Sequence, residues 1–130
     1  AFSLELACAG REERCAIVRR HSARLRKALS AYPAVRINSP EGAVPHILNL
    51  SVKNVKGTVF QRALSERGVC VSVKSACSAD GLPSRAVFAV SRDRRNALSS
   101  WRISLGHLTT DAEIDEFLAI FDECYHELVK

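Results

Sequence analysis

The sequence predicts a small α/β fold of the α+β two-layer type, in which a mostly antiparallel three-stranded sheet packs against helices. The chain has 130 residues, a length that suits one domain with one hydrophobic core. Its content of 47% apolar and 25% charged residues is that of an ordinary globular protein. Segments with helical periodicity alternate with segments of period two, so helices and strands are expected to share that core.

The first long helix is expected from about Arg14 to Ala31. Apolar residues such as Leu25 and Leu29 recur there at spacings of three and four, and basic residues fill most other positions. The preceding segment, residues 1–13, opens on a short apolar run that a glycine ends. We expect it to be the end of an inter-domain element, attached to a single domain that belongs to a longer protein. After the helix, Val35–Ile37 can form a short strand.

Two strands with a helix between them are expected in the middle of the chain. Ile47–Val52 alternates in the manner of a half-buried strand. Thr58 and Gln61 resemble a capping box, and Gly68 is placed to end the helix that follows them. Val69–Val73 is rich in β-branched residues and is expected to form a second central strand.

The last third of the chain is expected to contain a short helix, a strand and a long helix. The short helix follows Pro83, and the polar stretch Ser91–Ser100 is expected to be a mobile loop. Trp101–Leu105 alternates as a third strand. Thr110 opens a second capping box, and an apolar helical face continues from there to Leu128.

Charge and cysteine content exclude several classes of protein. The formal net charge of +5 would suit an acidic partner without requiring one. No apolar run approaches the ~20 residues that a membrane helix needs. The four histidines share no ligand spacing, so no metal is expected. The five cysteines are scattered without a CxxC pair, which favours reduced thiols in the cytoplasm over a disulfide framework or a zinc site: Cys8, Cys15, Cys70, Cys77 and Cys124.

Cys77 is the first candidate for chemistry. Small residues flank it, so its thiol is sterically open, and nearby Lys74 can favour the thiolate. The alternative is that any of the cysteines is a small apolar filler, which we expect of Cys15, Cys70 and Cys124. Both interpretations of Cys77 stay open on local pattern alone.

Arg102 is the second candidate. It lies between Trp101 and Ile103 in an apolar strand, where an unpaired guanidinium would be costly and a planar fork would suit a carboxylate. The alternative, an edge-strand arginine that points to solvent, has equal weight at this point.

Four motifs occur in an order that resembles a known family. They are Val44–Ser51 with its Pro-x-Ile-Leu-Asn pattern, Val71–Ser78 with Ser-Ala-Cys-Ser, Trp101–Gly106, and Thr109–Asp115. Together they cover nearly the whole chain. The sequence resembles the C-terminal small domain of the pyridoxal-phosphate-dependent cysteine desulfurases. These are fold-type I enzymes of the class V aminotransferase family.

The resemblance implies a role for both candidates. Cys77 would be the nucleophile that takes sulfur from L-cysteine as a persulfide, leaving L-alanine, and Arg102 would hold the substrate carboxylate. Pyridoxal 5'-phosphate would be bound by the large domain, with no cofactor-binding residue in these 130 residues, which alone are expected to be inactive. The full enzyme would be a homodimer that transfers sulfur to an acceptor or iron–sulfur scaffold protein.

Two alternatives stay open. One is another class V enzyme, such as a selenocysteine lyase, which preference for sulfur or selenium substrates would distinguish. The other is a stand-alone basic α+β module that binds RNA or a regulatory ligand through Arg19, Arg20 and Arg24. The basic helix has no interleaved aromatic residues, so no nucleic-acid partner is expected, and no membrane partner either.

Overall fold

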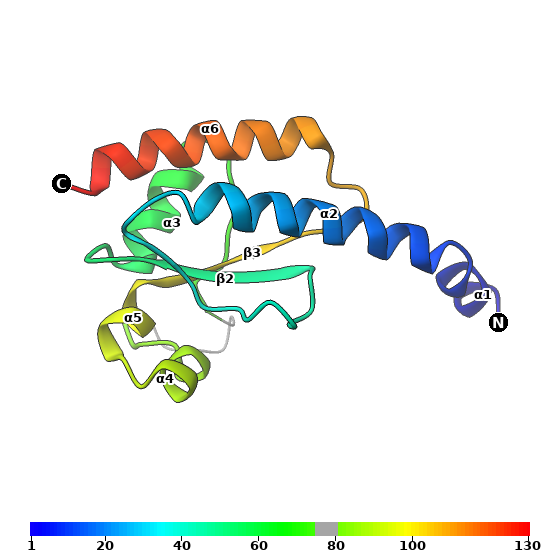
Figure 1. The fold of residues 1–130 in the computed structure, drawn as a ribbon, viewed down its shortest axis with the longest axis horizontal. Helices are drawn as coiled ribbons and strands as arrows, with labels where there is room; N and C mark the ends of the chain where they lie inside the picture. The colour runs from blue at the N-terminus through cyan, green and yellow to red at the C-terminus, as the bar shows by residue number, and fades with distance from the viewer. Residues whose placement is uncertain (75–80) are drawn as a thin grey trace.

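A three-stranded antiparallel sheet lies at the centre of the fold, in the order β1-β2-β3. The structure is a computed structural model that describes residues 1–74 and 81–130. The expected two-layer α+β class is confirmed, with helices packed on the sheet (Figure 1). The elements in chain order are α1 (Phe2–Cys8), α2 (Arg11–Leu29), β1 (Val35–Ile37), β2 (Ile47–Val52), α3 (Gly57–Ser65), α4 (Arg85–Ser91), α5 (Arg94–Ser99), β3 (Ser100–Ser104) and α6 (Asp111–Leu128).

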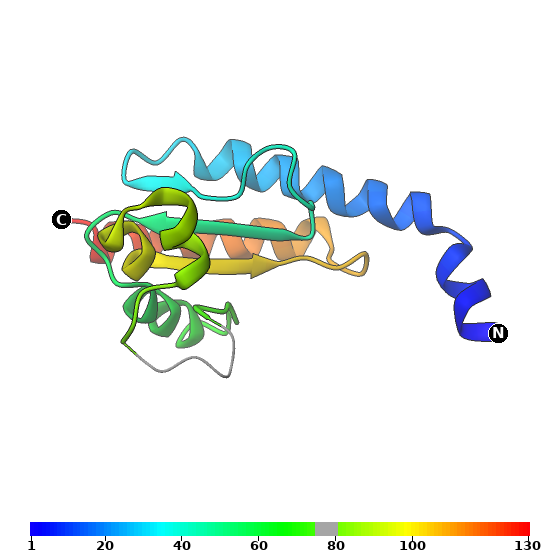
Figure 2. The ribbon, with the colours of Figure 1, turned by 90° about the horizontal axis from the view of Figure 1, so that it is seen from below.

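The two faces of the sheet differ in character. In the register of β2 with β3, Leu48 pairs with Ile103 and Leu50 pairs with Trp101, and all four side chains are buried. This apolar face packs against α2, α3 and α6, which lie together on one side of the sheet (Figure 1). Because side chains alternate along a strand, the residues between these point to the other face. That face is polar, and α4 and α5 lie over one end of it (Figure 2).

Aromatic rings fill the centre of the core. Trp101 of β3 stacks on Phe60 of α3 with ring centroids 5.2 Å apart, and Phe121 of α6 contacts both rings. All three side chains are fully buried. Leu25 and Leu29 of α2 close the core beside them. These contacts join a strand and three helices from distant parts of the sequence into one unit.

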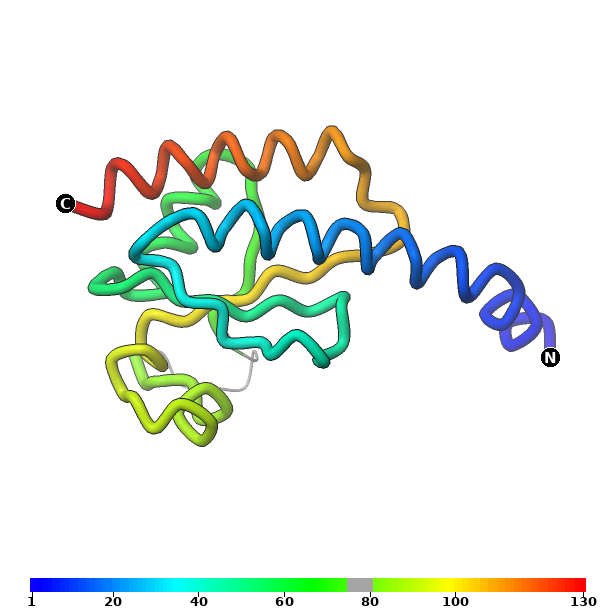
Figure 3. The backbone as a smooth tube through the Cα atoms, in the orientation of Figure 1, coloured from blue at the N-terminus to red at the C-terminus, as the bar shows by residue number. Residues whose placement is uncertain are grey.

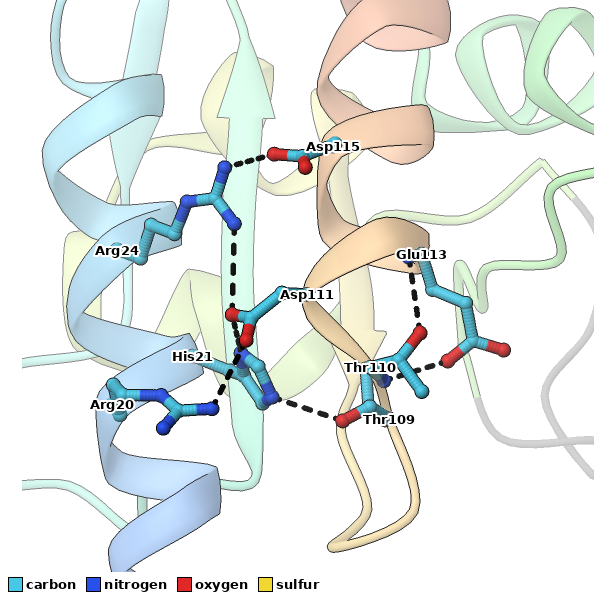
Figure 4. A network of polar contacts seen from close by, with 8 residues as sticks. All are labelled: Arg20, His21, Arg24, Thr109, Thr110, Asp111, Glu113 and Asp115. Carbon is cyan, nitrogen blue, oxygen red and sulfur yellow. Dashed lines mark hydrogen bonds and ion pairs between the residues drawn. The ribbon is translucent and has the colours of Figure 1, made fainter.

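Ion pairs join α2 to α6 along the edge of the core (Figure 4). Arg20 pairs with Asp111 at 3.3 Å, and Arg24 pairs with both Asp111 and Asp115. The buried His21 ring donates or accepts through Nε2 at the carbonyl oxygen of Thr109, 2.9 Å away. Two of the arginines on the basic helix therefore already have carboxylate partners in the fold.

The first helix stands apart from the rest of the chain. None of its residues is buried, and the path from α1 into α2 bends away from the sheet (Figure 3). The bend occurs at Gly10, whose φ of 68° lies in the left-handed region that favours glycine. The Arg14 side chain stabilises this corner by donating to the carbonyl oxygen of Ala9 at 2.8 Å.

The expected strand over Val69–Val73 is wrong. Only Ser72 pairs, in a single antiparallel bridge with Arg102. The Val69 amide instead donates to Leu64 at the end of α3, and the Val71 carbonyl accepts from the Gln61 side chain at 3.0 Å. These bonds use groups that a strand ladder would need. The third strand of the sheet is Val35–Ile37.

Two further expectations around helix ends are wrong. The capping box of Thr58 does not form: α3 begins at Gly57, its cap Lys56 makes no side-chain bond, and Gln61 is engaged at Val71. The polar stretch Ser91–Ser100 is not a loop, because it contains α5. The Asp93 side chain caps that helix by accepting from the backbone amide of Asn96 at 3.0 Å.

The capping box at the start of α6 is confirmed. Thr110 accepts from the Glu113 amide at 3.2 Å, and the Glu113 side chain accepts from the Thr110 amide at 2.8 Å (Figure 4). The predicted α2, β2 and β3 also form, within a few residues of the expected ends.

Gly57 is placed where no side chain fits, and we expect Gly57→Ala to destabilise the protein. A Cβ there would lie 2.3 Å from the backbone oxygen of Ser100, so α3 or β3 must shift. The expected loss is about 2 kcal/mol, as for overpacking of a core, measured by urea unfolding. Gly42→Ala is the matched control, since its Cβ would meet nothing within 4 Å. Equal stabilities of the two variants would contradict the close approach.

Tyr32 should make the stability fall at alkaline pH. Burial, and then the hydrogen bond to Asp122 at 2.7 Å, raise the pKa of Tyr32 from 10.0 to about 12. The folded state therefore favours the neutral phenol, and this contribution is complete below pH 10 and lost as the pH rises to about 12. We expect Tyr32→Phe to show a smaller decline over that interval in pH-dependent unfolding. Parallel curves for the two proteins would show that Tyr32 does not titrate there.

Candidate functional site

Arg102 occupies the middle of β3 on the polar face of the sheet. Its neighbours Trp101 and Ile103 are buried in the core, so the alternation of the strand turns Arg102 away from the core. Directly opposite on β2 is Asn49. Both residues line a cavity of about 960 Å³ between this face and α4. Although β3 is an edge strand of the sheet, its arginine lies in a cavity and is half-buried.

The guanidinium of Arg102 has no partner among the described residues. Its Nε is buried without a hydrogen-bond acceptor, and no carboxylate of residues 1–74 or 81–130 pairs with it. An enclosed donor without an acceptor costs free energy unless something supplies one. A carboxylate is the group whose geometry best matches the planar fork of arginine.

The lining of the cavity is positively charged. Among its described residues are four cationic side chains and no Asp or Glu: Arg36, Lys74, Arg85 and Arg102. Arg36 is 3.9 Å from Asp93, a residue outside the lining. Clefts lined by one sign of charge concentrate ligands of the opposite sign. The cavity is therefore suited to an anionic ligand.

A network of amides supports the floor of the cavity. Asn96 donates to Asn38 at 2.9 Å, and Asn38 donates in turn to Asn49 at 2.9 Å and to Ser51 at 2.8 Å. The Ser51 hydroxyl donates to the backbone oxygen of Asn96 at 3.0 Å, which closes the ring. Sequence reasoning assigned no role to these residues. The pattern that could have indicated them is the pair of polar residues, Asn49 and Ser51, at alternate positions of the expected strand.

Cys77 lies in residues 75–80, outside the described residues, so its expected role stays a prediction. The described residues on either side, Val73 and Lys74 before the segment and Leu82 and Pro83 after it, line the cavity that contains Arg102.

The other cysteines divide into two groups. Cys8, Cys15 and Cys70 are exposed, so the expectation that Cys15 and Cys70 fill apolar space is wrong. Cys124 is buried in the core, as expected, and burial raises the pKa of its thiol. A thiol whose pKa is raised by burial is less reactive than a free one.

The described lining does not form a site for pyridoxal phosphate. It contains no carboxylate that could face the pyridine nitrogen and no aromatic ring that could stack on it. Its donors suit the anionic part of a substrate. The part of the chain that the structure describes also holds no group of three His, Cys, Asp or Glu residues placed to bind a metal. Within those same residues, no helix is long and apolar enough to cross a membrane.

Comparison with known proteins identifies the family. The model of the family "Aminotransferase class-V" matches residues 5–117. A mitochondrial cysteine desulfurase of Eremothecium gossypii is 36% identical over 108 residues, which is 82% of this chain. A NifS-like protein from Rickettsia africae has a solved structure with a TM-score of 0.77 and 25% identity, covering 90% of this chain. A second NifS-like structure has a TM-score of 0.82 and 28% identity over 95% of the chain.

The match extends over only part of these relatives. The chain spans 22% of the length of the Eremothecium protein, and 30% and 31% of the two NifS-like chains. Within this chain the match is nearly complete, because the family model covers residues 5–117, which include Asn49 and Arg102. The fold agreement and the family match together confirm the resemblance found in the sequence, and the chain belongs to the class V aminotransferase family.

Proposed function

We propose that this chain is the C-terminal part of a cysteine desulfurase, which converts L-cysteine to L-alanine and transfers the sulfur to Cys77. The observation that carries the proposal is the guanidinium of Arg102, which has no partner among the described residues, in a cationic cavity. A substrate carboxylate would supply the acceptor that its buried Nε lacks. Membership of the family and the names of the similar proteins support the choice of reaction.

Arg102 is proposed to orient the substrate. The backbone of β3 is held on both sides, by the pairing with β2 and by the bridge to Ser72. The side chain therefore starts from a rigid strand, and a bidentate grip on the carboxylate would restrict how the rest of the amino acid lies.

Cys77 is proposed to accept the sulfur. Overall, the Cys77 thiol and L-cysteine yield L-alanine and a Cys77 persulfide: the C–S bond of the substrate breaks and an S–S bond forms. The two hydrogens needed at the substrate carbon and on the persulfide come from the two thiols, so the atoms balance without an external reductant. Residues on both sides of the segment that contains Cys77, among them Val73 and Leu82, line the cavity, which supports this assignment.

The proposal requires parts that lie beyond this chain's described residues. Pyridoxal phosphate, held by the rest of the full-length protein, would supply the electron sink that weakens the C–S bond. The persulfide would pass to an acceptor or iron–sulfur scaffold protein, and the full enzyme would be a homodimer. A reducing, cytoplasmic location belongs to the proposal, because a thiol that carries sulfur must return to the reduced state.

Arg102→Lys in the full-length protein should raise KM for L-cysteine and lower turnover. An ammonium is a point charge and cannot reproduce the two parallel hydrogen bonds of the guanidinium. The expected loss in kcat/KM corresponds to about 2 kcal/mol or more, as for hydrogen bonds to charged groups. Steady-state alanine formation measures it. Arg92→Lys, at an exposed arginine outside the cavity lining, is the control. Unchanged kinetics in Arg102→Lys would show that Arg102 does not bind the substrate carboxylate.

Cys77→Ser should abolish formation of the persulfide, because a hydroxyl cannot accept and hold the sulfur. After incubation of the full-length protein with L-cysteine, mass spectrometry of the peptide containing residue 77 should show one added sulfur atom in the parent and none in the variant. Cys70→Ser replaces an exposed cysteine and should retain the modification at Cys77. Sulfur found on Cys70, or full alanine turnover without Cys77, would show that another group is the acceptor.

A further inference from the structure

Asn49 lies beside Arg102 in a position that the proposed reaction leaves without a role. The two residues are direct partners in the antiparallel register of β2 and β3. Directly opposed residues on one face have Cβ atoms roughly 5 Å apart, within reach of a single small ligand. Both line the cavity, and both are half-buried.

The amide network sets the orientation of the Asn49 side chain. Its Oδ1 accepts from Asn38 at 2.9 Å. The Asn38 amide cannot flip without losing hydrogen bonds, because its Oδ1 accepts from Asn96 at 2.9 Å and its Nδ2 also donates to Ser51. The bond from Asn38 thus orients the Asn49 amide, and it leaves the Asn49 Nδ2 as a donor available to a ligand. Among the described residues, no acceptor is bound to that Nδ2.

We propose that Asn49 is a second donor to the carboxylate that Arg102 binds, and that the pair selects for a charged carboxylate. This inference rests on the proposed function for the identity of the substrate. Arg102 offers only donors, and Asn49 offers its Nδ2 donor because the bond from Asn38 holds its oxygen toward the network. A carboxylate offers only acceptors and satisfies both residues. A carboxamide brings an NH₂ group that faces a donor, so the pair rejects it.

Asn49→Asp tests the proposal with little change of shape. The variant keeps an oxygen that can accept from Asn38, so the network retains its bond, but it replaces the donor with a negative charge beside Arg102. In the full-length holoenzyme we expect KM for L-cysteine to rise roughly 10- to 100-fold, the loss typical of one hydrogen bond to a charged group plus repulsion. The inhibition constant of L-alanine, which carries the same carboxylate and does not react, should rise by a similar factor.

The preference for L-cysteine over L-cysteinamide shows whether Asn49 contacts the substrate carboxylate or only supports the structure. We expect Asn49→Asp to lower the ratio of kcat/KM for these two substrates, because the new carboxylate can accept from the amide. A variant that merely loosened the strand would weaken both substrates alike. Ser104→Asp is the matched control: it adds the same charge two residues from Arg102 on the same face, outside the cavity lining. Its effect on KM and on the ratio should be small.

The outcomes distinguish the inference from the proposed function. If the parent desulfurates L-cysteine and Asn49→Asp leaves KM, the L-alanine constant and the substrate ratio unchanged, the role of Asn49 is overturned and the function stands. If the parent binds L-alanine by calorimetry in a manner that depends on Asn49 but releases no alanine from L-cysteine, the function is overturned and the carboxylate contact stands. If the parent neither binds L-alanine nor forms alanine from L-cysteine, both are overturned.

Discussion

The antiparallel pairing of β2 with β3 determines both the core and the cavity. In one register, Leu50 meets Trp101 on the apolar face, and Asn49 meets Arg102 on the polar face. A slip of one residue would turn every side chain to the opposite face, placing a guanidinium in the core and an indole in the cavity. The free energy of burying the tryptophan therefore also holds the arginine in position.

The helices make this register rigid. Phe60 and Phe121 pack around Trp101 from two helices, and α3 approaches β3 so closely at Gly57 that only a hydrogen fits. The ion pairs of Arg20 and Arg24 with α6 close the far edge of the same core. A strand held in this way can present a side chain from a fixed backbone, which is the condition for orienting a small substrate.

The polar face carries a free energy cost that its ligand would relieve. An enclosed Arg102 Nε without an acceptor and a lining with no acidic residue among those described are unfavourable features in a protein that binds nothing. The amide ring through Asn38 and Asn96 is, by contrast, nearly saturated with hydrogen bonds. The face thus combines a hydrogen-bonded support with a donor set that lacks acceptors among the described residues, which suits the binding of an anion.

The periodicity of the sequence was sufficient for α2, β2, β3 and α6, since each buries one apolar face whose spacing is visible along the chain. The motifs around Asn49 and Arg102 were sufficient for the family, which the comparisons confirm. The conformation of Val69–Val73 could not be predicted, because the Gln61 side chain binds the Val71 carbonyl across space. Helix α5 could not be predicted, because Asp93 caps it within a stretch that looks like a polar loop. The meeting of Asn49 with Arg102, and the network that orients the amide, were decided only by strand register and by contacts between residues up to 58 positions apart. Such contacts leave no periodic trace in the sequence.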